Sequence, residues 1–219
     1  MKTNEFQKRL LSSIILIPLT LICIYQGSIL FNFFLLILLI LSIYEWKKIS
    51  NKKFLFIFGL IFLFFSFYTA YEIRNAFNYN GLFIFLFLII ICVSSDLGGY
   101  TFGKIFKGPK LTKISPNKTY SGVLGSFVLS IILTSFFVYR IEYLEITILE
   151  LNINLIILII VLSFISQTGD LLISYFKRKS NLQDTGNLIP GHGGILDRID
   201  GIIFVIPTFY FLKKLFFYI

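Results

Sequence analysis

The chain of 219 residues is 57% hydrophobic and only 14% charged, whereas an ordinary soluble domain is about 45–50% apolar and about 25% charged. Its apolar residues gather in uncharged runs at 14–24, 29–43 and 54–69. Because about 20 apolar helical residues cross the hydrocarbon core of a bilayer, this composition excludes a water-soluble globular protein and predicts an integral membrane protein. The formal net charge of +9 fits basic loops between spans, so we expect membrane lipids and no nucleic acid as partners.

Seven candidate membrane spans follow one another along the chain. In lipid the backbone must satisfy its own hydrogen bonds, so we expect each span to be a helix. We find no internal repeat and no soluble linker. The sequence therefore predicts an all-α fold, a polytopic helical bundle in which residues 1–219 form one membrane-embedded domain. The predicted spans are 10–26, 28–46, 54–71, 81–95, 121–139, 152–173 and 201–217.

The distribution of basic residues predicts how the chain crosses the membrane. With the N-terminus in the cytoplasm, 16 of the 20 Lys and Arg residues face inward, as the positive-inside rule favours. The outward exceptions are Arg74, Arg140, Lys213 and Lys214. Two long segments with unusual composition, 96–120 and 174–200, then both face the cytoplasm. We therefore expect a multi-pass protein of the inner (cytoplasmic) membrane whose active site faces the cytoplasm.

Four acidic residues lie at the predicted cytoplasmic ends of three spans: Asp96, Asp170, Asp197 and Asp200. A carboxylate near hydrocarbon costs several kcal/mol unless it is paired or faces a wet cavity. One interpretation is structural pairing, for example of Asp197 with Arg198 or a neighbouring Lys. The other is a metal site, since Mg²⁺ prefers hard oxygen ligands such as carboxylates and phosphates. If Asp197 and Asp200 lie on one helix, they share a face.

The segment 174–200 carries a long motif. It begins Ser174-Tyr-Phe-Lys-Arg178 and ends His192-Gly-Gly-Ile-Leu-Asp-Arg-Ile-Asp200. This pattern resembles the signature of the phosphatidate cytidylyltransferase (CDP-diacylglycerol synthase) family. The matching positions are Ser174, Lys177, Arg178, Asp184, Gly186, Pro190, His192, Gly193, Gly194, Asp197, Arg198 and Asp200. Gln183 departs from the pattern, because the family has Lys there.

Two further stretches carry the same resemblance. Residues 96–104 are similar to the family's D-x-G-A-Y-x-x-G stretch, and 114–125 to its SPKKTWEG stretch. The second match is imperfect, since Ser121 stands where the family has Glu. The similarity covers nearly the whole chain and is firmest over 94–201.

The resemblance implies an enzyme of phospholipid biosynthesis, a nucleotidyltransferase that converts CTP and phosphatidic acid to CDP-diacylglycerol and pyrophosphate. It implies Mg²⁺, as one ion or two, and leaves a monovalent ion and a homodimer open. Together with the acids at the span ends, it gives as candidate catalytic residues Asp170, Asp197, Asp200, Lys177 and Arg198, and as candidate metal ligands Asp96, Asp170, Asp197 and Asp200. The implied substrate-binding residues are Ser115, Pro116, Lys118, Thr119, Arg178, Asp184, His192, Gly193 and Gly194.

Other membrane proteins fit parts of the sequence. The CDP-alcohol phosphotransferase pattern requires further acids after Gly201, and none occurs before the chain ends. A CTP-dependent membrane lipid-alcohol kinase remains an alternative. An ion-coupled transporter is another, although it would place acids near the bilayer midplane, whereas these acids gather at one face. A product assay with CTP and phosphatidate discriminates among them.

Overall fold

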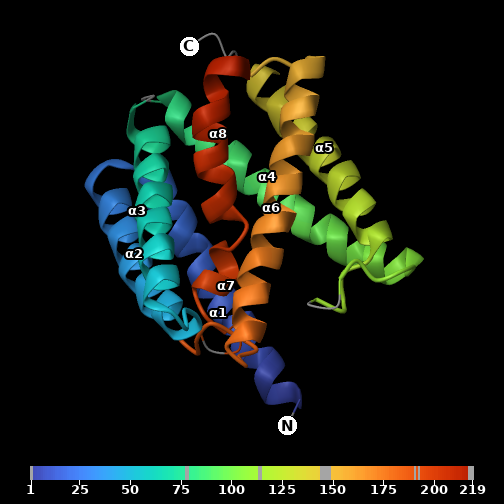
Figure 1. Cartoon of the computed structure of the whole chain (residues 1–219). Coiled ribbons are helices and arrows are strands. Elements are labelled where there is room, and N and C mark those ends of the chain that lie inside the picture. The colour runs from blue at the N-terminus through green and yellow to red at the C-terminus, as the bar shows by residue number, and fades with distance from the viewer. Residues whose placement is uncertain are drawn as a thin grey trace. The chain divides into compact units, whose positions relative to one another are not determined.

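The computed structural model describes residues 2–76, 79–112, 115–143, 149–189, 191 and 193–216. Helices dominate this part of the chain (Figure 1), which confirms the predicted all-α class. No strand is assigned in these ranges, and the only β-pairing there is two isolated bridges, Lys110 with Thr119 and Ile189 with Gly193. The helices are α1 (Lys2–Gln26), α2 (Ser28–Ile49), α3 (Lys53–Ala76), α4 (Tyr79–Phe106), α5 (Tyr120–Tyr143), α6 (Ile153–Lys179), α7 (Leu196–Ile199) and α8 (Ile202–Phe216).

Five helices are long and apolar enough to cross a membrane, so the chain has the character of a multi-pass membrane protein. They are Ser28–Ile49, Lys53–Asn75, Asn80–Phe106, Tyr120–Tyr143 and Ile153–Lys179. Two shorter apolar helices, Leu10–Gln26 and Ile202–Lys213, stand where the first and seventh spans are predicted. The count of seven spans and the cytoplasmic N-terminus stay predictions.

The helices that precede the two polar segments end later than predicted, at Phe106 and Lys179, whereas those that follow begin within one residue of the predicted spans. Helix α4 has 28 residues and continues to Phe106, so 96–106 is helical and the loop begins only at Lys107. Glycines 98, 99 and 103 suggest a loop in a soluble protein, but membrane helices use glycine for close packing. The chain leaves α4 through left-handed backbone at Lys107 (φ 52°) and Gly108 (φ 109°).

Asp197 and Asp200 do not lie on one continuous helix. Asp197 belongs to the four-residue helix α7, which ends at Ile199. Asp200 follows that end, and α8 begins only at Ile202. The shared helical face expected from their spacing is therefore absent.

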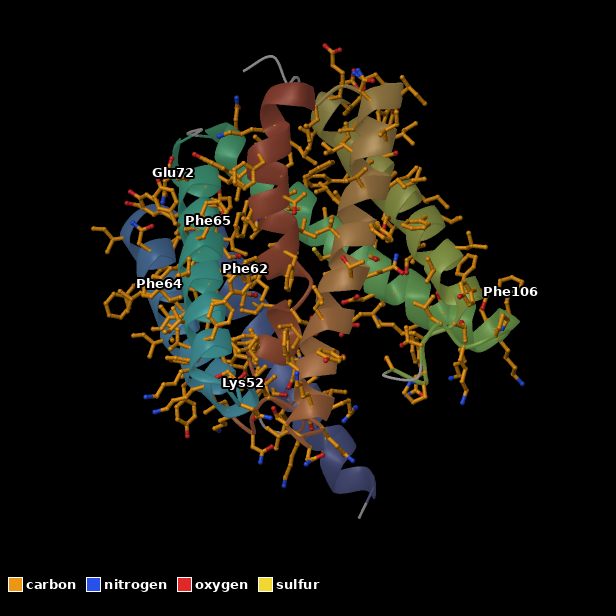
Figure 2. All side chains as sticks on the ribbon, in the orientation of Figure 1. Lys52, Phe62, Phe64, Phe65, Glu72 and Phe106 are labelled. Atoms are coloured by element: carbon orange, nitrogen blue, oxygen red, sulfur yellow. The ribbon has the colours of Figure 1, made fainter. Side chains whose placement is uncertain are left out.

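The chain divides into two compact units, which are described separately. The first consists of residues 1–82 and 175–199, and the second of 83–174 and 200–219. In the first unit α2 contacts α1, α3 and α7. Figure 2 shows Lys52, which directly precedes α3, at one end of this helix and Glu72, in its last turns, toward the other.

Two side chains fix the helices of the first unit. The Trp46 indole of α2 donates to the Phe56 carbonyl (3.3 Å) and lies edge-on to Phe176. The buried guanidinium of Arg74 donates to the carbonyls of Ile24 (2.8 Å) and Tyr25 (3.0 Å). It thereby satisfies carbonyls that the end of α1 leaves without helical partners. Arg74 thus has a structural role on the predicted outer side.

The second unit is held by close contact of small residues. A Cβ added at Gly98 of α4 would lie 2.3 Å from the Gly125 carbonyl oxygen of α5. Beside this contact, buried serines of α4, α5 and α6 bond to one another. Ser163 donates to Ser95 (3.1 Å), Ser126 donates to the Ser95 carbonyl (2.7 Å), and Ser130 lies within 3.3 Å of both Ser94 and Ser163. Such small and hydroxylated residues are the usual contacts between membrane helices.

We predict that Gly98→Ala lowers the stability of the protein in detergent. The new methyl group would meet backbone, which cannot rotate away, and overpacking of this kind costs about 1–3 kcal/mol. Leu97→Ala is the matched control, because Leu97 is about half exposed on the same helix. Thermal unfolding followed by size-exclusion chromatography measures both variants. Equal midpoints would contradict the contact between α4 and α5.

Candidate functional site

The signature segment of the first unit encloses one carboxylate, that of Asp197. Its Oδ1 accepts a hydrogen bond from Lys177 Nζ (2.7 Å), within an ion pair whose two side chains are about nine-tenths buried. Its Oδ2 accepts from the Thr185 N–H (2.8 Å), the Thr185 hydroxyl (3.0 Å) and the Gly194 N–H (3.0 Å). Donors therefore surround both oxygens and hold the carboxylate in one orientation.

Local turns bring these groups together. Helix α6 ends at Lys179, and Asn181 (φ 55°) reverses the chain. The Ser180 hydroxyl ties this end to the carbonyl of Ile49 (2.7 Å) at the end of α2. Lys177 thus faces Asp197, which is the second residue of α7. The chain returns through Gly193, whose φ of 84° favours glycine.

The absence of a side chain at Gly194 is required by its neighbours. A Cβ there would lie 2.0 Å from the Thr185 hydroxyl and 2.5 Å from Glu45 Oε2. The sequence predicts that Gly193 and Gly194 let backbone N–H groups approach phosphate. In the structure the Gly194 N–H donates a hydrogen bond to Asp197 Oδ2. His192 and Pro190, which belong to the same motif, lie outside the described residues.

The remaining signature residues of this unit present polar groups at its surface. The side chains of Arg178, Asp184 and Arg198 are exposed. Arg178 donates to the Leu182 carbonyl (3.0 Å). Two guanidinium groups are thus available to solvent beside the buried Lys177–Asp197 pair, and guanidinium groups bind phosphate through paired hydrogen bonds.

The second unit carries a separate ion pair, between Lys118 and Asp170. These side chains keep 26% and 29% of their area exposed. Lys118 Nζ also reaches the Gln167 carbonyl (3.4 Å), and Ser174 donates to Asp170 Oδ1 (3.4 Å). Asp170 of α6 is therefore joined to the turn that precedes α5.

That turn holds the other predicted binding residues of the second unit. The Lys118 N–H bonds to the Ser115 carbonyl (3.1 Å), with Pro116 exposed between them. Thr119 is the N-cap of α5, because its hydroxyl accepts the Gly122 N–H (3.1 Å). Ser115, Pro116, Lys118 and Thr119 thus occupy one short turn, as the SPKKTWEG resemblance leads us to expect.

Asp96 and Asp200 are the other two predicted metal ligands of the second unit. Asp96 is exposed on α4, and Asp200 accepts the Gly201 N–H (2.9 Å) before α8 begins. Three of the four predicted metal ligands therefore belong to this unit, and Asp197 belongs to the other.

Carboxylate oxygens suit a hard cation such as Mg²⁺. Among the residues that the structure describes, no group of three or more His, Cys, Asp and Glu side chains could hold a metal ion. Asp170 and Asp197 each pair with a Lys. The pairing of Asp197 with a neighbouring Lys is confirmed, with Lys177 as the partner. A cation at either position would have to share the carboxylate with that Lys.

Sequence reasoning assigned no role to two residues that bind this segment, Glu45, which resembles the family at its position, and Thr185. Glu45 is the only acidic residue of α2 and is fully buried. Its oxygens accept from the Thr185 hydroxyl (2.7 Å) and from the N–H groups of Ile195 (3.0 Å) and Leu196 (2.8 Å). An acid at the end of an apolar run was the available signal, because such a residue needs partners.

We predict that Lys177→Met destabilises the protein by about 3 kcal/mol, because removing one partner of a buried pair leaves an uncompensated charge. Lys179→Met is the control, since Lys179 is exposed on the same turn of α6. Thermal midpoints in one detergent compare the two. A Lys177→Met midpoint equal to that of Lys179→Met would remove the pair from any role in stability.

Comparison with known proteins places the chain in a family. A model described as the cytidylyltransferase family matches residues 54–216. Proteins named phosphatidate cytidylyltransferase are similar to it in Rickettsia bellii (34% identity; 95% of this chain, 90% of the relative) and Rickettsia felis (37%; 94% and 92%). The relative in Bacillus subtilis is 40% identical over 71% of this chain, but the match covers only 56% of that protein. The chain belongs to the cytidylyltransferase family.

Proposed function

We propose that this protein is a phosphatidate cytidylyltransferase, which makes CDP-diacylglycerol and pyrophosphate from CTP and phosphatidic acid. The observation that carries the proposal is the signature segment 174–200, which encloses Asp197 with Lys177 and presents Arg178 and Arg198 at the surface. Each relative described above bears the name of this activity. The long apolar helices suit a lipid substrate that stays in the bilayer.

The reaction requires positioning and charge neutralisation more than proton transfer. An oxygen of the phosphatidate phosphate forms a bond to the α-phosphorus of CTP. The bond from that phosphorus to the bridging oxygen breaks, and pyrophosphate leaves with the electron pair. The attacking phosphate is already ionised at neutral pH, so no general base is needed. In phosphoryl-type transfers most of the catalysis comes from alignment and from charges that face the phosphates.

Four basic residues of the motifs can supply those charges. Lys177, Arg178 and Arg198 come from the signature segment, and Lys118 comes from the turn before α5. Lys177 and Lys118 are held by aspartates, so each ammonium group is already oriented. A Lys ammonium is a compact charge with three donors, which allows it to contact a phosphate oxygen while it keeps its carboxylate.

We further propose that Asp96, Asp170, Asp197 and Asp200 hold Mg²⁺, as one ion or two. Bound Mg²⁺ neutralises charge on the phosphates and on the departing pyrophosphate. The support is the chemistry of the donors, since all four offer hard oxygens, and the placement of each beside a sequence motif of the family. At Asp170 and Asp197 the ion would have to share the carboxylate with the paired Lys.

We also propose that the protein lies in the inner membrane as a seven-span chain with its N-terminus and active site in the cytoplasm. The support is the distribution of Lys and Arg between the predicted loops. CTP is a cytoplasmic nucleotide, and this orientation puts both signature segments on its side. The family resemblance also allows a homodimer, which the molar mass of the purified protein in detergent would establish.

We predict that purified protein transfers label from α-labelled CTP to a lipid-soluble product only with phosphatidate and Mg²⁺ present. Asp197→Asn should lower this rate by 100-fold or more, on the order seen when an aspartate essential to catalysis is removed. Glu72→Gln, on α3 away from the motifs, is the control.

The label distinguishes the alternatives. A lipid-alcohol kinase would transfer γ-label and leave the α-label in a soluble nucleotide, and a transporter would form no labelled lipid. Either result would overturn the proposed activity. Normal turnover by Asp197→Asn would remove that residue from catalysis.

We predict that a cysteine at position 52 reacts with an impermeant maleimide from the cytoplasmic side and one at position 140 from the opposite side. Lys52→Cys and Arg140→Cys are introduced singly after the buried Cys23 and Cys92 are replaced by Ala. Both target positions are exposed. Inside-out vesicles and intact spheroplasts present the two sides. The reverse pattern would invert the proposed topology.

A further inference from the structure

The first unit contains a carboxylate that the proposed reaction does not use. Glu45 has no exposed area and lies near the end of α2, far in sequence from the signature segment. Its two oxygens accept from the backbone of Ile195 and Leu196, at the start of α7. Those N–H groups have no partner within the helix. Glu45 therefore fixes where α7 begins, and Asp197 is the next residue.

A single hydroxyl joins this carboxylate to the proposed catalytic one. The Thr185 oxygen lies 2.7 Å from Glu45 Oε2 and 3.0 Å from Asp197 Oδ2. Thr185 is 1% exposed, and its own N–H also bonds to Asp197 (2.8 Å). Thr185 thus lies between two carboxylates and has a donor for each.

Two glycines of the signature lie so close to Glu45 and Thr185 that neither position can carry a side chain. A Cβ at Gly186 would lie 2.7 Å from Glu45 Oε1, and one at Gly194 would lie 2.0 Å from the Thr185 hydroxyl. Both glycines belong to the signature, so the motif encloses the side chains of Glu45 and Thr185 as closely as it encloses Asp197.

We propose that Glu45 and Thr185 are positioning residues, which hold the Asp197 carboxylate toward Lys177 and the substrate. This inference rests on the proposed function only for its effect on turnover. The positioning itself is a property of the first unit. An amide cannot replace Glu45, because each of its two oxygens accepts a backbone N–H and Gln has one acceptor atom.

The test compares Thr185→Val, which keeps the shape and removes the hydroxyl, with Thr185→Ser, which keeps the hydroxyl. We expect Thr185→Val to lower kcat by about 10- to 100-fold, as loss of a supporting hydrogen bond does around metal-binding carboxylates, with the KM for CTP changed by less than about threefold. Thr185→Ser should stay within about threefold of wild type. Glu45→Gln should lower kcat as much as Thr185→Val does. It replaces Thr185→Val in the test if the valine variant is not recovered folded.

Thr69→Val is the matched control. Thr69 is also fully buried in the first unit, but its hydroxyl bonds only to the carbonyl of Ser66 on its own helix (2.8 Å). Loss of a buried hydroxyl in general would affect both valine variants equally. Positioning of Asp197 predicts that Thr69→Val retains the kcat of wild type.

Amide hydrogen exchange of the peptide 184–197 provides a readout independent of activity. The N–H groups of Thr185, Gly194, Ile195 and Leu196 are all donated to Glu45 or Asp197. Thr185→Val and Glu45→Gln should speed exchange in this peptide, and Thr185→Ser and Thr69→Val should not. Unchanged exchange and kcat in Thr185→Val, or equal losses in Thr185→Ser, would overturn the positioning role. If wild-type protein makes no cytidine-linked lipid, the proposed function fails and the exchange result alone decides.

Discussion

The first unit depends on the requirement that a buried carboxylate be surrounded by donors. Ionised groups removed from water cost several kcal/mol unless they are paired and hydrogen-bonded. Glu45 and Asp197 meet this requirement with six donors: Lys177, four backbone N–H groups of the signature segment, and the Thr185 hydroxyl, whose one proton lies within reach of both acids. Between α6 and α7, the residues that the structure describes form neither a strand nor a helix. The order of this segment comes from these two acids.

In the part of the second unit that the structure describes, the helices pack together through small residues, glycines and serines, and not through buried ion pairs. Its helices contain little charge, and in lipid the hydrophobic effect does not drive one apolar helix onto another. Gly98 and Gly125 let two backbones approach, and the serines of α4, α5 and α6 bond across the same interface. This interface includes Ser94 and Ser95, which directly precede Asp96. The residues that pack the helices thus also set the place of an acid proposed to bind metal.

Much of this organisation could be predicted from the sequence. Long apolar runs predicted membrane helices, and the signature from Ser174 to Asp200 predicted the family that the comparisons confirmed. The extent of α4 could not be predicted from composition, because the glycines at 98, 99 and 103 are as typical of a loop as of a helix that packs closely against another. The partners of Asp170 and Asp197 could not be predicted either. Lys118 and Lys177 are two of the many basic residues near those acids, and only the fold selects them.

Glu45 shows why the rest of the site escaped sequence reasoning. Its bonds reach 140 to 151 residues along the chain, to Thr185, Ile195 and Leu196, and no local pattern encodes contacts of that separation. The signature sequence does not reveal that Glu45 contacts it, because its glycines, considered without the rest of the chain, suggest contact with phosphate. In the structure, Gly186 and Gly194 are small because acid and hydroxyl oxygens occupy the space beside them.

The choice of Lys over Arg beside both aspartates has a physical consequence. An Arg would form a rigid, two-pronged bond with a carboxylate, whereas a Lys presents a single charge on a flexible stem. Lys118 and Lys177 each keep ammonium protons that could bond a phosphate oxygen while the pairs with Asp170 and Asp197 remain in place. The guanidinium groups of Arg178 and Arg198, by contrast, are exposed, where a fork-shaped donor suits the phosphates of an arriving nucleotide. The lysines thus lie beside the aspartates and the arginines at the surface, each in the position that suits its geometry in the proposed transfer.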